Sequence, residues 1–285
     1  VLAWVGTDGY NTINTMLTNG YSSSHKVTHW GDRSEMGVSV AYGAGTWLLA
    51  YAGNDEDYAT RGRLIYYKFS NDGVNWSGPY FVDYCPSLAY PQYGSLSAPA
   101  VAYHSSSGRF VLVFVNWRTD PQFDEIVPYG KIRWYTTTDP RSGFSKCGEL
   151  DRLSWNTPGL ACSPSWCVMT AIDHEATGGN MFWNGCGTVS ADGSFVVSFW
   201  SSQRYWTTRS EISNAFGYDA SGKPIYLVAY RGQDGATRGN VGRKNSCSPS
   251  VPWSSRSTLS KTFYTGPTLV YGPARNEFLL YYTEP

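Results

Sequence analysis

Apolar and polar residues alternate along most of the chain in short runs that are typical of β-strands. One unit recurs: an apolar strand ending in an aromatic residue, a turn rich in Gly or Ser, and a second apolar strand. Because each pair of strands is joined by a short turn, we predict an antiparallel hairpin for every copy. The copies cover residues 38–55, 100–120, 187–204, 215–234 and 268–285, and residues 1–8 match the second half of the unit.

A third alternating strand follows the hairpins, for example at residues 63–70 and 131–138, and a weaker fourth strand follows at residues 80–84. Four antiparallel strands repeated roughly every 55 residues are typical of the blades of a β-propeller. We therefore predict an all-β fold in which residues 1–285 form a single propeller domain of four-stranded antiparallel blades. Five copies of the hairpin predict five blades; a sixth, degenerate blade and a pair of stacked β-sandwiches are the alternatives.

Two parts of the chain depart from the repeat. Residues 148–184 lack the unit and carry several cysteines, which predicts an irregular insertion. The chain begins and ends on a second strand of the unit, so we predict that the N- and C-terminal segments close one blade together. Such closure would remove an open sheet edge.

The composition narrows the choice of partners. Aromatic residues make up 16% of the chain and charged residues only 15%, and 22 Lys and Arg balance 22 Asp and Glu. A nucleic-acid-binding protein needs a surplus of positive charge, and a membrane-surface protein needs a basic face, so we expect neither partner. No apolar run approaches the ~20 residues that span a bilayer. We expect a monomer without membrane insertion.

Six cysteines and the absence of a Cys-x-x-Cys pair favour disulfides over a metal site. An even number of cysteines in a Tyr-, Ser- and Gly-rich chain is typical of secreted proteins, and we expect a mature secreted form with up to three bridges. The spacing leaves the pairing open, although Cys162 and Cys167 could close their short loop. The remaining cysteines are Cys85, Cys147, Cys186 and Cys247.

The turn Ser-Asn-Asp-Gly-Val-Asn-Trp at residues 70–76 resembles the Asp-box of the sialidase-like β-propeller superfamily, in a version one residue shorter than usual. In such a turn Asp72 would accept amide hydrogens, Gly73 would adopt a positive φ, and Trp76 would pack between sheets. Partial echoes occur at residues 137–144 and 17–23. The resemblance, to propellers of the secreted bacterial type, implies the fold. The sialidase catalytic motifs, including an Arg-Ile-Pro segment near the start, are not found in this sequence.

Candidate site residues follow from the propeller geometry. The Asp-box turn joins strands three and four, so the ligand face should lie at the other end, where strand two leads into strand three. The residues that end strand two in successive units are Asp8, Asp55, Asp120, Arg204 and Asp234. We predict that they ring one mouth of the channel. The alternative is that each Asp caps its own loop.

Neighbouring loops add polar and aromatic side chains that could grip a sugar. We assign Asp55, Asp120 and Asp234 as candidate catalytic carboxylates. The candidate ligand-binding residues are Asp8, Glu35, Tyr58, Arg61, Trp117, Arg204 and Arg231. Asp173, His174 and Glu175 form the densest ionisable triplet, and His104 falls in a hairpin turn at the opposite end, where we expect it to be solvated.

These features predict a secreted propeller that binds an oligo- or polysaccharide through loops at one end of the channel. A glycoside hydrolase or polysaccharide lyase that uses the clustered carboxylates is the first alternative. A protein-interaction scaffold is the second. We expect no cofactor, with structural calcium as an option that clustered Asp residues would suit.

Overall fold

A computed structural model gives the fold of the chain. The structure describes residues 1–18, 23–34, 36–53, 64–83, 85–86, 88, 95, 97–116, 118–120, 125–127, 130–172, 182–203, 212–232, 238–244, 247, 257–263, 266–273 and 275–282.

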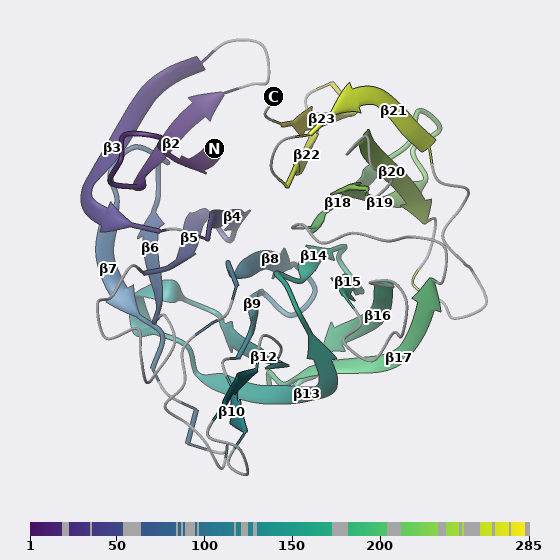
Figure 1. The fold of residues 1–285 in the computed structure, drawn as a ribbon, viewed down its shortest axis with the longest axis horizontal. Helices are drawn as coiled ribbons and strands as arrows, with labels where there is room; N and C mark the ends of the chain where they lie inside the picture. The colour runs from purple at the N-terminus through teal and green to yellow at the C-terminus, as the bar shows by residue number, and fades with distance from the viewer. Residues whose placement is uncertain are drawn as a thin grey trace.

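Antiparallel sheets stand around a common axis and form a β-propeller (Figure 1). Blade 1 consists of β4 (Val38–Gly43), β5 (Thr46–Ala52), β6 (Ile65–Ser70) and β7 (Ser77–Phe81). Blade 2 consists of β8 (Ala100–His104), β9 (Arg109–Val115), β12 (Gly130–Thr137) and β13 (Lys146–Ser154). Blade 3 consists of β14 (Gly159–Cys162), β15 (Cys167–Ile172), β16 (Phe182–Val189) and β17 (Phe195–Gln203). Blade 4 consists of β18 (Ile212–Tyr218), β19 (Pro224–Arg231), β20 (Arg238–Lys244) and β21 (Ser257–Thr262).

The two chain ends supply smaller sheets that hold the fifth position of the ring (Figure 1). The N-terminal sheet contains β1 (Leu2–Val5), β2 (Thr12–Thr18) and β3 (Ser23–Arg33), and the C-terminal hairpin contains β22 (Thr268–Gly272) and β23 (Glu277–Tyr281). These observations confirm the predicted all-β, five-bladed propeller of antiparallel sheets. Over the described residues the two end sheets are not paired with each other, and their closure into one blade stays a prediction.

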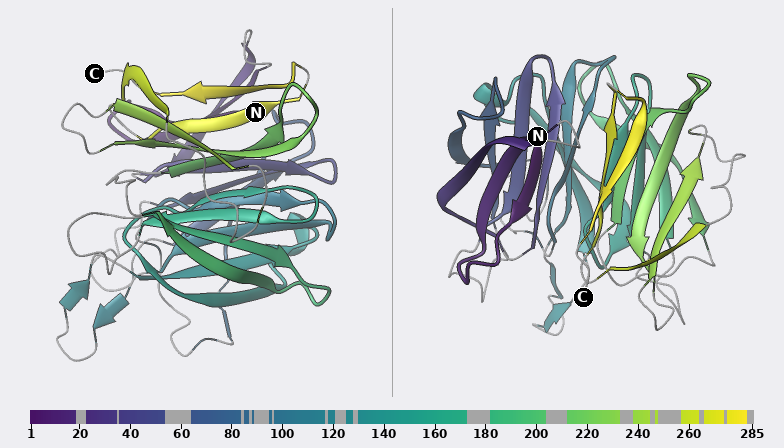
Figure 2. Two further views of the ribbon diagram at one scale, coloured as in Figure 1. Left: turned by 90° about the vertical axis from the view of Figure 1, so that its right-hand side faces the viewer. Right: turned by 90° about the horizontal axis from the view of Figure 1, so that it is seen from above.

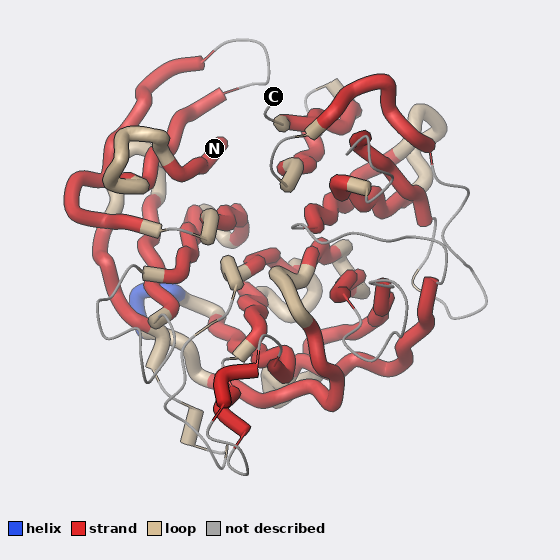
Figure 3. The backbone as a smooth tube through the Cα atoms, in the orientation of Figure 1, coloured by secondary structure: helices blue, strands red, loops and turns tan. Residues whose placement is uncertain are grey.

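Two further elements complete the described structure. A short ribbon of β10 (Arg118–Asp120) and β11 (Glu125–Val127) projects beyond the ring (Figure 2), and η1 (Pro140–Ser142) is a 3₁₀ turn between β12 and β13. Strands dominate the backbone tube in Figure 3. Within the described ranges no helix is both long and apolar enough to cross a membrane.

The predicted hairpins form the first two strands of their sheets in four of five cases. They correspond to β4–β5, β8–β9, β18–β19 and β22–β23. The interpretation of residues 187–204 is wrong, because they run from β16 into β17, the third and fourth strands of blade 3. The predicted insertion at residues 148–184 is also wrong, because it contains β14 and β15, the first two strands of that blade. Their turn lacks glycine and β14 ends in Cys162 without an aromatic residue, so the repeat was hidden.

The second strand of each blade is apolar on both faces because it packs between two neighbouring sheets. In β5, Leu48 contributes to the core shared with blade 2, whereas Leu49 contributes to the core shared with the N-terminal sheet. Similar cores lie between blades 2 and 3, between blades 3 and 4, and between blade 4 and the C-terminal hairpin. Many aromatic residues, among them Phe110, Phe114 and Tyr135, fill the space between blades.

We call the first strand of each blade, which lies nearest the axis of the ring, its inner strand (Figure 1). A repeated contact sets how closely neighbouring inner strands approach. The ring of Tyr103 on β8 lies directly on Gly43 of β4, and the ring of Tyr271 on β22 lies on Gly217 of β18. A β-carbon at either glycine would overlap the ring. Nearer the start of the same inner strands β4 and β18, Ser39 Oγ accepts the Val101 amide at 3.1 Å and Ser213 Oγ accepts the Leu269 amide at 2.9 Å.

The aromatic-on-glycine contact predicts that Gly43→Ala destabilises the protein by about 1–3 kcal/mol, the usual range for overpacking a core. Gly272 is the matched control. It occupies the same place on β22, but the nearest neighbour of an added β-carbon is 3.6 Å away, so Gly272→Ala should have little effect. Chemical unfolding of both variants tests this prediction, and equal losses would contradict it.

The turn at residues 70–76 has the hydrogen bonds that its sequence predicts. Asp72 Oδ1 accepts the amides of Val74 at 2.9 Å and Asn75 at 2.8 Å, and these bonds hold the pKa of Asp72 well below its usual range. Gly73 has a φ of 74°, and Trp76 packs edge-on against His29 of the N-terminal sheet.

Two other turns between third and fourth strands follow the same pattern. In blade 3, Asp192 accepts from Ser190 Oγ at 2.6 Å and from the Ser194 amide at 3.1 Å, and Gly193 again has a positive φ. In blade 2, Asp139 accepts the Arg141 amide at 3.0 Å, within the predicted echo at residues 137–144. Part of the other echo, residues 19–22, lies outside the described residues.

All six cysteines are paired, which confirms the three predicted bridges. Cys162–Cys167 closes the hairpin of blade 3. Cys85–Cys147 ties the segment after β7 to blade 2, and Cys186–Cys247 ties blade 3 to the segment after β20. Two bridges therefore connect neighbouring blades, and one is local.

The bridges should differ in their effect on stability because they close loops of different length. Removing Cys85–Cys147, which spans 62 residues, should lower the free energy of unfolding by about 4 kcal/mol. Removing Cys162–Cys167, which spans five residues, should lower it by about 2 kcal/mol on the same chain-entropy scale. Urea unfolding of the two Cys→Ser double variants measures which loss of stability is larger. A larger loss for the local bridge would contradict this account.

Candidate functional site

The two ends of the ring carry different kinds of connection. Turns between strands one and two, and between strands three and four, lie at one end, which we call the hairpin end. Because neighbouring strands are antiparallel, the connections from strand two to strand three lie at the other end, which we call the loop end. The prediction places ligand binding at the loop end.

Most of the predicted site residues lie outside the described residues. They are Glu35, Asp55, Tyr58, Arg61, Trp117, Arg204 and Asp234. Asp120 is the last residue of β10, on the projecting ribbon, and its side chain also lies outside the described part (Figure 2). Arg231 ends β19, the second strand of blade 4, opposite Gly239.

The placement of Arg204 in the ring is wrong. It follows β17, which is the outermost strand of blade 3, rather than a second strand. The second strand of that blade is β15, which ends at Ile172, so Asp173 is the next residue along the chain. With the corrected register, the triplet of Asp173, His174 and Glu175 follows strand two as Asp55 and Asp234 do. The side chains of the triplet lie outside the described residues.

Asp8 is the one member of the ring whose side chain the structure describes. Its Oδ1 accepts the amides of Tyr10 at 3.1 Å and Thr12 at 3.3 Å. Hydrogen bonds from Thr12, first through its side chain, lower the pKa of Asp8 and keep it ionised. Asp8 therefore caps its own loop, which is the alternative set out for each Asp of the ring.

Metal binding finds no support in the described part of the chain, where no group of three His, Cys, Asp or Glu side chains could hold an ion. Structural calcium stays an untested option.

Two hollows lie between the inner strands and the chain ends, and they share part of their lining, including Val1 and Val40. A cavity of about 140 Å³ lies where the inner strands begin, at the loop end, between residues such as Ser39, Pro99 and Pro158. A larger cavity of about 590 Å³ opens at the hairpin end. Its lining includes aromatic residues near the ends of the inner strands, Tyr42, Tyr103, Phe216 and Tyr271, together with Trp47 and Tyr281.

The larger cavity has aromatic ring faces at its wall. Tyr42 packs against Trp47 with ring centroids 4.6 Å apart, and Tyr271 packs against Phe278 at 5.0 Å. Arg275 and Glu277 line the same cavity from the turn of the C-terminal hairpin. The wall therefore combines apolar ring surface with a small number of polar groups, as small-molecule and peptide sites commonly do.

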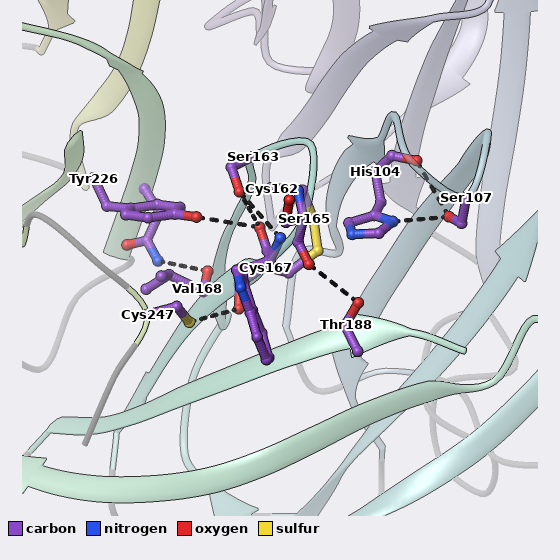
Figure 4. The surroundings of a disulfide bond; sticks show 12 residues. His104, Ser107, Cys162, Ser163, Ser165, Cys167, Val168, Thr188, Tyr226 and Cys247 are labelled. Carbon is purple, nitrogen blue, oxygen red and sulfur yellow. Dashed lines mark hydrogen bonds between the residues drawn. A yellow bond between two sulfur atoms is a disulfide. The ribbon is translucent and has the colours of Figure 1, made fainter. Parts of the chain in front are cut away.

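A polar pocket of about 430 Å³ lies at the hairpin end between blades 2 and 3, beside the Cys162–Cys167 bridge (Figure 4). Thr188 Oγ1 donates to the carbonyl of Ser165 at 3.2 Å. His104 lies at the predicted end, but the expectation that it is solvated is wrong: it is buried, and its Nδ1 lies 2.9 Å from Ser107 Oγ. It fills the position that Gly43 and Gly217 hold in blades 1 and 4.

Sequence reasoning missed a buried charged cluster between the N-terminal sheet and blade 1. Lys68 Nζ lies 2.5 Å from Asp32 Oδ2, and the hydroxyl of Tyr51 donates to Asp32 Oδ1 at 3.0 Å. His29 Nε2 lies 2.9 Å from Thr15 Oγ1 in the same interface. Asp32 and Lys68 satisfy each other inside the interface, so we assign them to the packing of the sheets.

This cluster makes stability depend on pH. Burial, with the charge of Lys68, lowers the pKa of His29 from 6.5 to about 4. An unfolded His binds a proton near pH 6.5, whereas folded His29 stays neutral, so stability should fall as the pH drops from 7 towards 4, by about 2 kcal/mol at pH 5.

Chemical unfolding between pH 4 and 8 measures this loss. His29→Gln should flatten the pH dependence over that window, and replacement of the exposed His25 by Asn, which tolerates its positive φ, should not. The same slope in His29→Gln and in the unmodified protein would show that another group is responsible.

Comparisons with known proteins show a shared fold. No protein-family model and no curated protein sequence matches the chain. The structure is similar to NanB sialidase from Streptococcus pneumoniae, with a TM-score of 0.56 and 10% identity over 98% of this chain and 44% of that chain. It is similar to Penicillium chrysogenum alpha-L-arabinanase complexed with arabinobiose, with a TM-score of 0.56 and 13% identity over 86% of this chain and 74% of that one.

Trypanosoma rangeli sialidase gives a similar result, with a TM-score of 0.56 and 10% identity over 91% of this chain and 45% of that chain. The chain thus spans less than half the length of both sialidases. These likenesses show that the protein shares the β-propeller fold of these sialidases and of the arabinanase, and the predicted resemblance is confirmed at the level of the fold. A shared fold does not by itself give the reaction.

Proposed function

We propose that the protein is a secreted propeller that binds carbohydrate through the loops at the loop end of its channel. The observation that carries the proposal is topological: every connection from a second to a third strand leaves the ring at this end. On this basis the proposal assigns Asp55, Asp120 and Asp234 to the loop end, together with Tyr58, Arg61 and Trp117. Carboxylates that accept sugar hydroxyls beside aromatic rings that cover the C–H face suit a saccharide.

Two further features support the proposal. Three disulfides fit a protein of an oxidising, extracellular environment. The arabinanase of the same fold is complexed with arabinobiose, and the Trypanosoma rangeli sialidase with 2,3-difluorosialic acid. A glycoside hydrolase that uses two carboxylates of the ring is the second candidate, favoured by the fold shared with these two enzymes.

A glycan array run with the full chain tests binding. We expect selective binding to one class of oligosaccharide, and a loss of at least about tenfold in Asp55→Asn and Asp120→Asn, since a buried polar contact with a ligand contributes about 1.4 kcal/mol or more. Asp72→Asn, which alters a turn at the hairpin end, is the matched control and should bind normally. Binding to no glycan would refute the carbohydrate proposal.

Release of reducing sugar from mixed polysaccharides separates the two candidates. Binding without release supports a binding module. Release that disappears in Asp55→Asn or Asp120→Asn, while binding persists, supports the hydrolase.

A further inference from the structure

The polar pocket of about 430 Å³ between blades 2 and 3 is built from turns that are fixed to one another. The amide of Ser106, in the turn between β8 and β9, donates to the carbonyl of Pro164, in the turn between β14 and β15, at 3.1 Å. Thr136 Oγ1 donates to the carbonyl of Gly193 at 2.5 Å, so the turn between β16 and β17 is also held against blade 2. The walls of the pocket are therefore pre-organised.

Most of the side chains that line the pocket can donate hydrogen bonds. A guanidinium and an imidazole occur together with hydroxyl groups, and among the lining residues, all of which the structure describes, there is no carboxylate. Donors of this kind suit a ligand that carries negatively charged oxygen atoms. The lining hydroxyls belong to Ser106, Ser107, Thr138, Ser165, Thr188 and Ser190.

Arg109 supplies the positive charge of the pocket. Its guanidinium rests on the backbone of Gly193, where an added β-carbon would lie 2.6 Å from Arg109 Cζ, and its Nη1 donates to Ser145 Oγ at 3.3 Å. Within the part of the chain that the structure describes, Arg109 has no carboxylate partner, and Asp192, beside Gly193, pairs with Lys146 at 3.9 Å. A guanidinium that is held in place without a carboxylate is well suited to a tetrahedral oxyanion.

His104 supplies a buried nitrogen to the same pocket. The residue is 2% exposed, and its Nδ1 lies 2.9 Å from Ser107 Oγ, whereas its Nε2 is buried without a hydrogen-bond partner. Figure 4 shows the imidazole between Ser107 and the blade 3 residues Ser165 and Thr188, so Nε2 lies on the side of blade 3. When Ser107 donates to Nδ1, the hydrogen of the neutral ring is on Nε2. A ligand oxygen would then accept a hydrogen that no protein group accepts.

Packing alone does not explain this imidazole. In two other contacts between inner strands, a glycine lies at the position of His104 and a tyrosine ring covers it. Between blades 2 and 3 no such ring is present, because Cys162, four residues after Pro158, stands where Tyr103 stands four residues after Pro99. An apolar side chain at position 104 would fill the space of the ring without burying an unpaired nitrogen. The choice of histidine therefore points to a ligand.

We propose that this pocket binds a phosphate or sulfate group, with Arg109 balancing its charge and Nε2 of His104 donating to one of its oxygens. Serine and threonine hydroxyls of the lining donate to the other oxygens. Phosphate and sulfate share tetrahedral oxyanion chemistry, and the pocket is larger than one such ion, so it also has room for part of an ester. The pocket lies at the hairpin end, and the inference is independent of carbohydrate binding at the loop end.

Isothermal titration calorimetry with the full chain, at constant ionic strength, tests binding. The probes are inorganic phosphate, inorganic sulfate, methyl phosphate and methyl sulfate. We expect saturable binding of at least one probe at a single site. Tighter binding of a methyl ester than of its parent ion would assign the site to an ester, and the reverse order would assign it to a free ion.

Two arginine variants locate the site. Arg109→Gln should weaken binding about tenfold or more, because a charged hydrogen bond to the ligand is lost. Arg141→Gln is the matched control, since Arg141 also lies at the hairpin end but is paired with Asp139 at 3.0 Å, and it should bind normally.

Two variants of His104 test the role of Nε2. His104→Asn keeps an amide near Ser107 but has no atom at the place of Nε2, so it should also bind about tenfold more weakly. His104→Gln carries an amide nitrogen further along the side chain and should bind more tightly than His104→Asn. Thermal unfolding shows whether each variant is folded, and Arg109→Gln decides the question if a variant of the buried histidine is not.

Three results would overturn the proposal. They are the absence of saturable binding to every probe, equal binding by Arg109→Gln and the unmodified protein, and an equal loss in Arg109→Gln and Arg141→Gln.

Discussion

Packing between sheet faces is the interaction on which the rest of the structure depends. Each blade has apolar residues on both faces, so it is stable only between two neighbours, and a ring provides two neighbours for every blade. β5 shows this burial most clearly, because residues 48–52 are almost wholly buried although successive side chains point to opposite faces of the sheet. The contact of an aromatic ring with a glycine, Tyr103 on Gly43 and Tyr271 on Gly217, then sets the distance between inner strands.

Because of this packing requirement, residues between the blades and residues at the ends of the ring have different roles. Two pairs of polar groups lie buried in this way, Asp32 with Lys68 between the N-terminal sheet and blade 1, and Thr170 with Asn214, 2.8 Å apart, between blades 3 and 4. They contribute to the specificity and pH dependence of packing rather than to a site. Side chains free to bind a ligand must therefore come from the ends of the ring. The hairpin end is occupied by tight, self-capped turns such as the one around Asp72, which leaves the longer connections of the loop end for recognition.

The fold could be predicted because the hairpin repeats in the sequence with its apolar alternation intact. Blade 3 was misread for a physical reason. Cys162–Cys167 closes its first turn without glycine, and the turn at Ser190–Gly193 resembles a turn between strands one and two although it joins strands three and four. That error moved Arg204 into the ring in place of Asp173. The long-range bridges and the pair of Asp32 with Lys68 could not be predicted, because residues 36 to 62 positions apart meet only after the blades pack. Among the site residues, the sequence left two roles open for Asp8, a ligand contact or a cap of its own loop. Its hydrogen bonds to Tyr10 and Thr12 show that it caps the loop.

Hydrogen–deuterium exchange of the full chain, with and without the best oligosaccharide from the array, tests most directly where carbohydrate binds. The account predicts slower exchange in the segments that follow second strands, residues 54–63, 116–130 and 232–237, and no change in the hairpin turns at residues 43–46 and 104–109. Protection confined to those hairpin turns, or protection in neither set of segments, would contradict it.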